Sequence, residues 1–135
     1  MKLKFFLIFL FLISIFLSFS VTAQSPNVIV VEITDTIDQS TVDILKESIQ
    51  LAKNENSQAI ILLLDTPGGG LKETFEIAEI INNSEIPVVG YVYPTGSAAW
   101  SAGTFILIST HVAVMADYTI IGSCQPVEIS FDSTF

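Results

Sequence analysis

A short, wholly apolar run that stops at a glycine-rich turn constrains this fold more than any other feature of the sequence. Residues 59–64 read AIILLL and residues 65–70 read DTPGGG. A strand that is apolar at every position is typical of a parallel sheet covered on both faces. The glycines end the strand sharply and precede a segment with helical spacing. Residues 59–70 therefore predict a strand followed by a tight turn and a helix, the repeating unit of α/β folds.

The segments on either side continue this alternation of strands and helices. Residues 27–33 are β-branched and predict a strand, and residues 38–54 carry apolar side chains at helical spacing. Further segments follow in the same order: a helix after residue 70 that buries Leu71, Phe75, Ala78 and Ile81, a strand over 86–92, a buried helix over 104–108, and strands over 112–116 and 119–122. We expect an α/β fold with a mostly parallel sheet and alternating helices, incomplete at the C-terminus because the pattern fades after Gly122.

The first 23 residues predict an export signal or an N-terminal membrane anchor. Lys2 and Lys4 precede an apolar run over residues 5–19, and small residues follow up to Ala23. This order favours a secretory signal peptide cleaved after Ala23. An uncleaved anchor stays open as the alternative, because about 17–20 apolar residues suffice to span a bilayer. In both cases residues 24–135 form one extracytoplasmic domain that is membrane-associated or secreted.

Composition argues against several classes of function. After residue 23 the chain carries 14 acidic residues against three lysines, with no arginine. Nucleic-acid binding needs clustered basic side chains, so no nucleic-acid partner is expected. His111 is the one histidine and Cys124 the one cysteine, so neither a metal cluster nor an internal disulfide is expected. The sequence calls for no cofactor.

Two loops of small residues follow predicted strands, at the sheet edge where open α/β folds place their sites. The glycines at 68–70 leave backbone N–H groups beside a helix N-terminus, where they can stabilise an oxyanion. A plain tight turn explains them equally well. The second loop, residues 94–104, offers Ser97 and Ser101, and a serine at the start of a helix has its oxygen near the positive helix end. Close helix packing is the structural alternative for this loop.

Taken together, the loops resemble the NfeD-type membrane serine peptidases, the partners of stomatin. The resemblance rests on DTPGG at 65–69, YVYP at 91–94 and SAGT at 101–104, and it covers about residues 27–126. These peptidases are relatives of the Clp protease proteolytic subunit and of signal peptide peptidase A. The resemblance therefore implies a ClpP/crotonase-like fold.

The same resemblance implies roles for individual residues. The sequence AWSAG at 99–103 fits the family's Ala-Xaa-Ser-Xaa-Gly pattern and makes Ser101 the nucleophile, with Ser97 kept as a second candidate. The N–H groups of Gly69 and Ala102 would form the oxyanion hole. Trp100, beside the nucleophile, would either shape a hydrophobic substrate pocket or serve packing.

Two departures from the family pattern concern the general base. The histidine of the Clp subunit sits just before a Gln-Pro pair, whereas Cys124 holds that position here. NfeD-type enzymes instead look to a downstream lysine, and this sequence has no lysine after Lys72. We expect His111 to be a surface residue at a helix end, Cys124 to be a buried structural thiol rather than a nucleophile, and Asp65 to cap the glycine turn.

The resemblance implies an extracytoplasmic, membrane-associated serine endopeptidase that cleaves hydrophobic segments of membrane proteins such as stomatin-like partners. Its serine nucleophile would use a lysine base that is missing from this chain, so the 135-residue form is expected to lack full activity. The resemblance also implies a homo-oligomer. One alternative is a catalytically inactive ClpP-like scaffold or binding module of a stomatin-type membrane complex. Another is a crotonase-type acyl-CoA enzyme, against which the export signal and the scarcity of basic residues argue.

Overall fold

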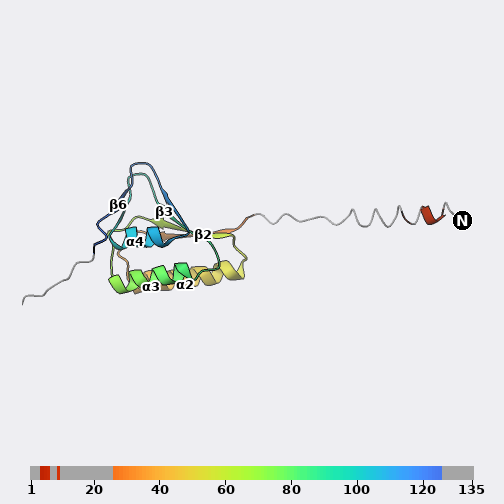
Figure 1. The fold of residues 1–135 in the computed structure, drawn as a ribbon, viewed down its shortest axis with the longest axis horizontal. Coiled ribbons are helices and arrows are strands. Elements are labelled where there is room, and N and C mark those ends of the chain that lie inside the picture. Colours follow the sequence, from red (N-terminus) through yellow and green to blue (C-terminus); the bar gives the residue numbers. More distant parts are fainter. Residues whose placement is uncertain (1–3, 7–8, 10–25, 126–135) are drawn as a thin grey trace, which may run out of the picture.

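The computed structural model describes residues 4–6, 9 and 26–125. The expected signal peptide or anchor over residues 1–23 therefore lies almost wholly outside the described residues. Within the described part of the chain, no helix is both long enough and apolar enough to cross a membrane. The elements in chain order are β1 (Val28–Ile33), α2 (Gln39–Asn54), β2 (Ala59–Leu64), α3 (Leu71–Asn82), β3 (Val88–Val92), β4 (Ala98–Trp100), α4 (Ala102–Ser109), β5 (Val112–Met115) and β6 (Ile120–Gly122) (Figure 1).

The main sheet has the strand order β1-β2-β3-β5, and every neighbouring pair in it is parallel. This arrangement confirms the expected α/β fold with a mostly parallel sheet. A second, two-stranded parallel sheet pairs β4 with β6. The short strand β4 lies inside the stretch that the sequence predicts to be a loop, so the second candidate loop is anchored by strand pairing on its C-terminal side.

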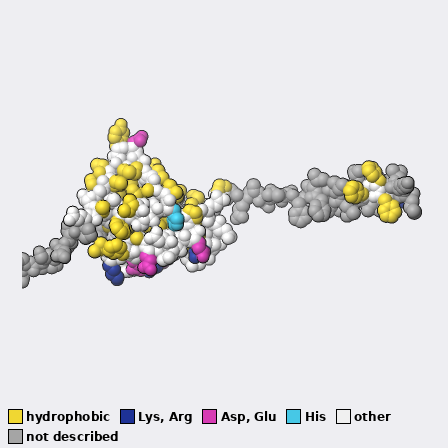
Figure 2. Space-filling view, in the orientation of Figure 1, with side chains coloured by type: hydrophobic (Ala, Val, Ile, Leu, Met, Phe, Trp, Pro, Cys, Tyr) yellow, Lys and Arg dark blue, Asp and Glu magenta, His cyan; other side chains and the backbone are white. Residues whose placement is uncertain are grey.

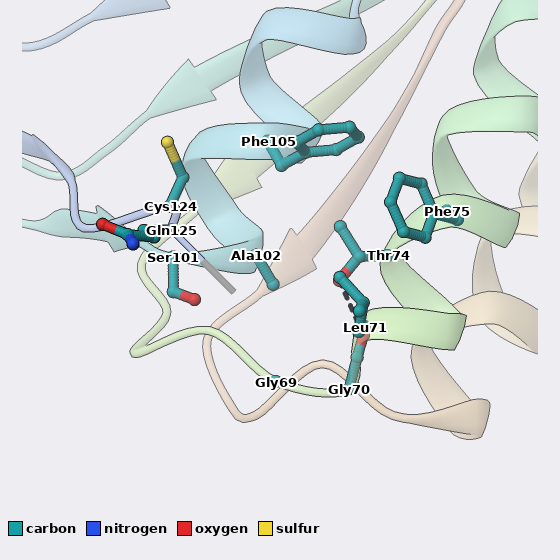
Figure 3. Close-up of a pocket in the computed structure, with 10 residues that line it drawn as sticks. All are labelled: Gly69, Gly70, Leu71, Thr74, Phe75, Ser101, Ala102, Phe105, Cys124 and Gln125. Carbon is teal, nitrogen blue, oxygen red and sulfur yellow. Dashed lines mark hydrogen bonds between the residues drawn. The ribbon is translucent and has the colours of Figure 1, made fainter. Parts of the chain in front are cut away.

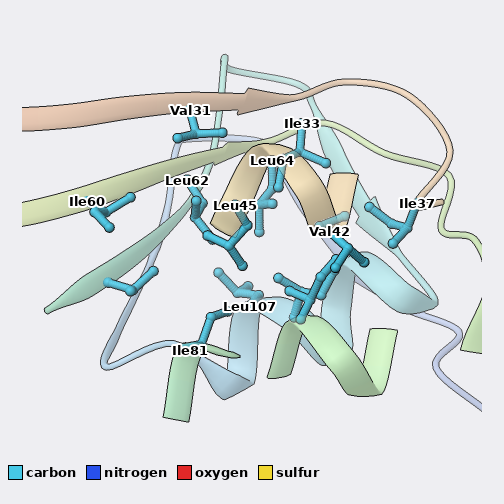
Figure 4. Packing of buried hydrophobic residues seen from close by; sticks show 14 of the residues in the cluster. Val31, Ile33, Ile37, Val42, Leu45, Ile60, Leu62, Leu64, Ile81 and Leu107 are labelled. Carbon is cyan, nitrogen blue, oxygen red and sulfur yellow. The ribbon is translucent and has the colours of Figure 1, made fainter. Parts of the chain in front are cut away.

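The hydrophobic core lies between the main sheet and its helices. In Figure 1, α2 and α3 run side by side along one side of the molecule, and α4 packs against α3 and β3. Alternate residues of β2 point into the core, which is the period expected of a strand. Figure 4 shows the strand residues Val31, Ile33, Ile60, Leu62 and Leu64 facing the helix residues Val42, Leu45, Ile81 and Leu107.

The opposite face of the main sheet is apolar and partly exposed. One row of paired residues crosses all four strands and consists of Val30, Ile61, Val89 and Val112. Val30 and Val112 are exposed, while Ile61 and Val89 are half-buried. The expectation that β2 is covered on both faces is therefore wrong for the described residues, because α2, α3 and α4 all pack on the face that carries Leu62. The charged side chains visible in Figure 2 gather mainly along the helix side of the molecule.

The start of α2 makes one testable prediction about pH. The Asp38 carboxylate accepts hydrogen bonds from Ser40 and from the Thr41 N–H, and these bonds lower the pKa of Asp38. A lowered folded-state pKa stabilises the protein above the ordinary aspartate pKa of about 3.9, and this contribution disappears as the pH falls through the folded-state value.

Thermal unfolding of the wild type and of Asp38→Asn checks this prediction, because asparagine caps a helix without titrating. Between about pH 6 and pH 3 the wild type is expected to lose more thermal stability than Asp38→Asn. Equal losses in the two proteins would contradict the role assigned to the carboxylate.

Candidate active site

The glycine-rich loop after β2 is shaped by a buried threonine. Thr66 is 2 % exposed; its hydroxyl donates to the Asp35 carbonyl at 2.6 Å and accepts from the Gly68 N–H at 3.1 Å. The Asp65 carboxylate instead accepts from the Ala98 N–H at 3.1 Å, at the start of β4. The expectation that Asp65 caps the glycine turn is therefore wrong. Thr66 shapes that turn instead. It is the second residue after β2, and its hydroxyl links the Gly68 N–H in the turn to the Asp35 carbonyl in the segment after β1.

A short backbone pairing with Ile37 orients the glycines. The Ile37 N–H donates to the Gly68 carbonyl at 2.9 Å, and the Gly70 N–H donates to the Ile37 carbonyl at 2.8 Å. In this parallel bridge, the N–H of the middle residue, Gly69, points away from Ile37. Among residues 26–125, no acceptor takes a hydrogen bond from Gly69 N–H. Within the described residues, the loop thus presents one free donor, at the residue to which the family resemblance gives an oxyanion role.

Ser101 occupies a sharp turn between β4 and α4. Its backbone dihedrals are φ 50° and ψ −111°, in a region that costs a non-glycine residue about 1–3 kcal/mol. The Ser101 N–H donates to the Gly122 carbonyl at 2.8 Å, which ties the turn to β6. A strained strand-to-helix turn that carries a serine is the arrangement that exposes nucleophiles in many hydrolases. The residue type alone does not predict this backbone conformation.

Ala102 is the first residue of α4, so its N–H has no partner within the helix. No acceptor in the described range 26–125 takes a hydrogen bond from it. The two candidate loops are in contact: a Cβ placed on Gly68 would lie 2.8 Å from the Ser101 Cβ and 3.3 Å from the Ala102 nitrogen. The glycine loop and the start of α4 therefore form one continuous surface.

Ser101, Gly69 and Ala102 line the same cavity, which has a volume of about 410 Å³. Figure 3 shows Phe75 and Phe105 facing each other at the far side of this cavity from Ser101; their ring centroids are 5.3 Å apart in an edge-to-face arrangement. The structure thus brings together the three residues that the family resemblance implies. It adds an aromatic wall, formed by Phe75 and Phe105, that the sequence did not predict.

The aromatic wall corrects the expected burial of α3. Leu71 and Phe75 are both 53 % exposed, whereas the sequence predicts them on the buried face of the helix. Both side chains line the cavity instead of entering the core. Helical spacing identifies one apolar face, but it does not distinguish residues that enter a core from residues that border an opening.

Ser97, the second candidate nucleophile, and His111 do not line this cavity. Ser97 is 6 % exposed and is not among the residues that line the cavity. His111 is exposed, two residues after the end of α4, and its Nδ1 accepts a hydrogen bond from the Val88 N–H at 3.1 Å. His111 is therefore a surface residue at a helix end, as the sequence predicts, and it fastens the start of β3.

Cys124 lines the cavity with Ser101, whereas Trp100, the residue before Ser101, does not. Cys124 is exposed and lines the cavity, so the expectation of a buried structural thiol is wrong. The reason is that the chain after β6 passes along the cavity opening, where nothing in the described residues covers it. Trp100 does not line the cavity; its ring lies against Gly122, where an added Cβ would be 3.8 Å from Trp100 Cζ3. Of the two roles considered for Trp100, the structure favours packing.

The cavity wall within residues 26–125 contains no lysine or histidine. Lys46 pairs with Glu76 at 2.6 Å and Lys53 with Glu85 at 3.6 Å, both on the helix surface. No group of three or more potential metal ligands is present in the described part of the chain. The cavity therefore offers a hydroxyl and two free N–H donors, but no basic side chain from these residues.

Comparison with known proteins gives consistent matches. The family described as NfeD1b, N-terminal domain, matches residues 27–133. The membrane-bound protease PH1510 of Pyrococcus horikoshii is 40 % identical over 116 residues, which are 86 % of this chain and 26 % of that protein. The membrane protein NfeD1b of Bacillus subtilis is 33 % identical over 106 residues, which are 78 % of this chain and 24 % of that protein. The chain thus spans about a quarter of the length of these curated relatives.

Solved structures resemble the fold as well. A serine-to-alanine mutant of the 1510-N membrane-bound stomatin-specific protease superposes with a TM-score of 0.75 and 38 % identity, covering 82 % of this chain and 54 % of that one. A lysine-to-alanine mutant of the same protease, in complex with a substrate peptide, has a TM-score of 0.74, 40 % identity and coverages of 82 % and 50 %. A ClpP1 mutant from Listeria monocytogenes has a TM-score of 0.60 at 18 % identity, covering 68 % of this chain and 54 % of that one. The fold is therefore ClpP-like, as expected.

Proposed function

Because this chain belongs to the NfeD1b N-terminal domain family, we propose that it is the peptidase module of a membrane-associated serine endopeptidase. One observation carries the proposal: Ser101 stands at a strained strand-to-helix turn, on the same cavity as the free N–H groups of Gly69 and Ala102. A nucleophile next to two unoccupied donors supplies two of the three parts that acyl transfer needs, and the third is a general base. A serine mutant among the solved relatives adds support for a serine in this role.

The mechanism follows from the positions of these groups. The Ser101 hydroxyl attacks the scissile carbonyl carbon and gives its proton to the base, while the carbonyl oxygen becomes an oxyanion that accepts hydrogen bonds from Gly69 and Ala102. The tetrahedral intermediate collapses to an ester with Ser101, and the amine leaves with a proton from the base. Water then hydrolyses the ester. Each oxyanion donor of this kind contributes about 10²–10³-fold to the rate.

The base in this proposal is a lysine supplied from outside the described residues, held neutral by burial. The lysine-to-alanine mutant of a relative, with its substrate peptide, motivates this assignment. We place the module outside the cytoplasm, after a signal peptide or anchor over residues 1–23, because the apolar start of the sequence has that composition.

The proposed substrate is a hydrophobic segment of a membrane protein such as a stomatin-like partner. Leu71, Phe75 and Phe105 give the cavity an apolar wall that suits large apolar side chains. A relative from Pyrococcus horikoshii is a membrane protease specific for a stomatin homologue, which supports a stomatin-like protein as the substrate. Self-association through the exposed apolar face of the sheet is part of the same proposal, because exposed apolar patches mark interaction surfaces.

One observation favours a second candidate function. Since no lysine or histidine of residues 26–125 lines the cavity, a catalytically inactive scaffold of a stomatin-type complex is the alternative. Such a module would keep the cavity for binding a peptide without cleaving it. The two candidates differ in the reactivity of Ser101.

A serine-directed fluorophosphonate probe tests the proposal on the full-length gene product. The probe is expected to form a covalent adduct that mass spectrometry locates on Ser101, because the adduct needs an activated hydroxyl and free oxyanion donors. Ser101→Ala protein serves as the control and should show only background labelling. If folded wild-type protein binds an apolar peptide but takes up no probe, the scaffold function replaces the peptidase.

A further inference from the structure

Thr104, in the first turn of α4, joins three elements around the candidate nucleophile. Its side chain is buried, with 6 % of the residue exposed. The hydroxyl oxygen lies 2.6 Å from the Ala99 carbonyl oxygen in β4 and 2.9 Å from the Gly122 carbonyl oxygen in β6. It also accepts a hydrogen bond from the Gly122 N–H at 2.7 Å. One hydroxyl therefore meets both polar groups of the Gly122 backbone.

Gly122 is also the residue that holds Ser101. Its carbonyl accepts the Ser101 N–H at 2.8 Å, so Ser101 and Thr104 both bond to the same residue of β6. Gly122 has a φ of 145°, a backbone angle that residues with a Cβ rarely adopt. Ser101 has a strained backbone of its own, and such conformations persist only when the surroundings impose them. The Ser101 turn thus depends on where the Gly122 backbone lies.

We propose that Thr104 is a positioning residue: its hydroxyl fixes the Gly122 backbone and thereby sets the orientation of Ser101. The inference rests on the proposed peptidase function for its catalytic consequence. The same bond also places the chain that follows β6, whose residues Cys124 and Gln125 form part of the cavity wall. Without this hydroxyl, the Gly122 N–H would lose its partner in a partly buried site.

The variants Thr104→Val and Thr104→Ser separate the hydroxyl from the volume of the side chain. Valine keeps the shape and loses the hydrogen bonds, whereas serine keeps the hydroxyl. We expect Thr104→Val to lower kcat for an apolar peptide by about 10–100-fold with little change in KM, because a misplaced nucleophile slows the chemical step. Thr104→Ser should restore most of this loss.

Thr110→Val is the matched control, at the other end of α4. The Thr110 hydroxyl donates to the Leu107 carbonyl at 2.7 Å and lies away from the cavity. Its replacement should leave kcat unchanged. A loss of kcat equal to that of Thr104→Val would show a general effect of the helix and would overturn the inference.

Amide hydrogen exchange tests the positioning without relying on activity. In the full-length wild type, the Gly122 and Ser101 amides are expected to exchange as slowly as amides of the core strands. In Thr104→Val both should exchange at least about 10-fold faster, and Thr104→Ser should return them toward wild type. Fast exchange of Gly122 in the wild type would overturn the inference even if Thr104→Val fails to fold. Wild-type protein with protected amides but no probe labelling would overturn the peptidase function alone.

Discussion

Replacing Ser101 with alanine is expected to lower the rate of peptide cleavage by about 10⁴-fold or more, because a serine hydrolase site without its nucleophile retains only the contribution of binding and oxyanion donors. The full-length gene product would be assayed with a peptide that contains an apolar stretch. The alanine variant should keep about the thermal stability of the wild type, since alanine carries the same Cβ and leaves the strained backbone of residue 101 unchanged.

Ser97→Ala is the control for this experiment. Ser97 lies four residues before Ser101 and loses the same hydroxyl in this change, but it is buried and does not line the cavity. Cleavage should survive this change within about twofold. If cleavage were lost in Ser97→Ala and kept in Ser101→Ala, Ser97 would be the nucleophile and the proposed site would be wrong.

Replacing Gly69 with alanine is expected to lower the free energy of unfolding by about 3 kcal/mol, the upper range for forcing extra atoms into a packed site. A Cβ at this position would overlap the Ile37 carbonyl oxygen and lie 2.5 Å from the Ile37 nitrogen. These atoms belong to a backbone bridge and cannot move aside as a flexible side chain would. Denaturant unfolding of the two proteins measures the difference.

Gly70→Ala provides the comparison, one residue further along the same loop. Its φ is −65°, and the nearest atoms that an added Cβ would meet belong to the side chain of Glu73, which can rotate away. We expect this variant to stay within about 0.5 kcal/mol of the wild type. Equal losses for both variants would show that the loop tolerates neither methyl group and that the bridge with Ile37 is not the cause.

The main sheet follows from the sequence because strong local patterns specify it. The apolar strand β2 and its glycine-rich end predict the strand-turn-helix unit, and β1 and β3 repeat the pattern on either side. The strand β4 escapes prediction because two alanines and a tryptophan among small loop residues carry no period-two signal. Its pairing with β6 is a long-range contact that no window of sequence contains.

The candidate site likewise has parts that the sequence predicts and parts that only the fold reveals. Ser101, Gly69 and Ala102 come from motifs, and the structure places all three on one cavity. The positive φ of Ser101 and the role of Thr104 arise from β6, some twenty residues downstream along the chain, so they need the fold to be seen. The exposure of Cys124 has the same cause, since only the packing of neighbouring elements shows whether a side chain is covered.

The backbone of Ser101 implies a trade-off at a single position. Glycine adopts a positive φ without the steric penalty of a Cβ, so a glycine at residue 101 would relax the turn. That exchange would also remove the hydroxyl on which the proposed reaction depends. Selection for heat resistance and selection for turnover would thus favour different residues at position 101, and a variant library screened only for thermostability would drift toward stable, inactive protein.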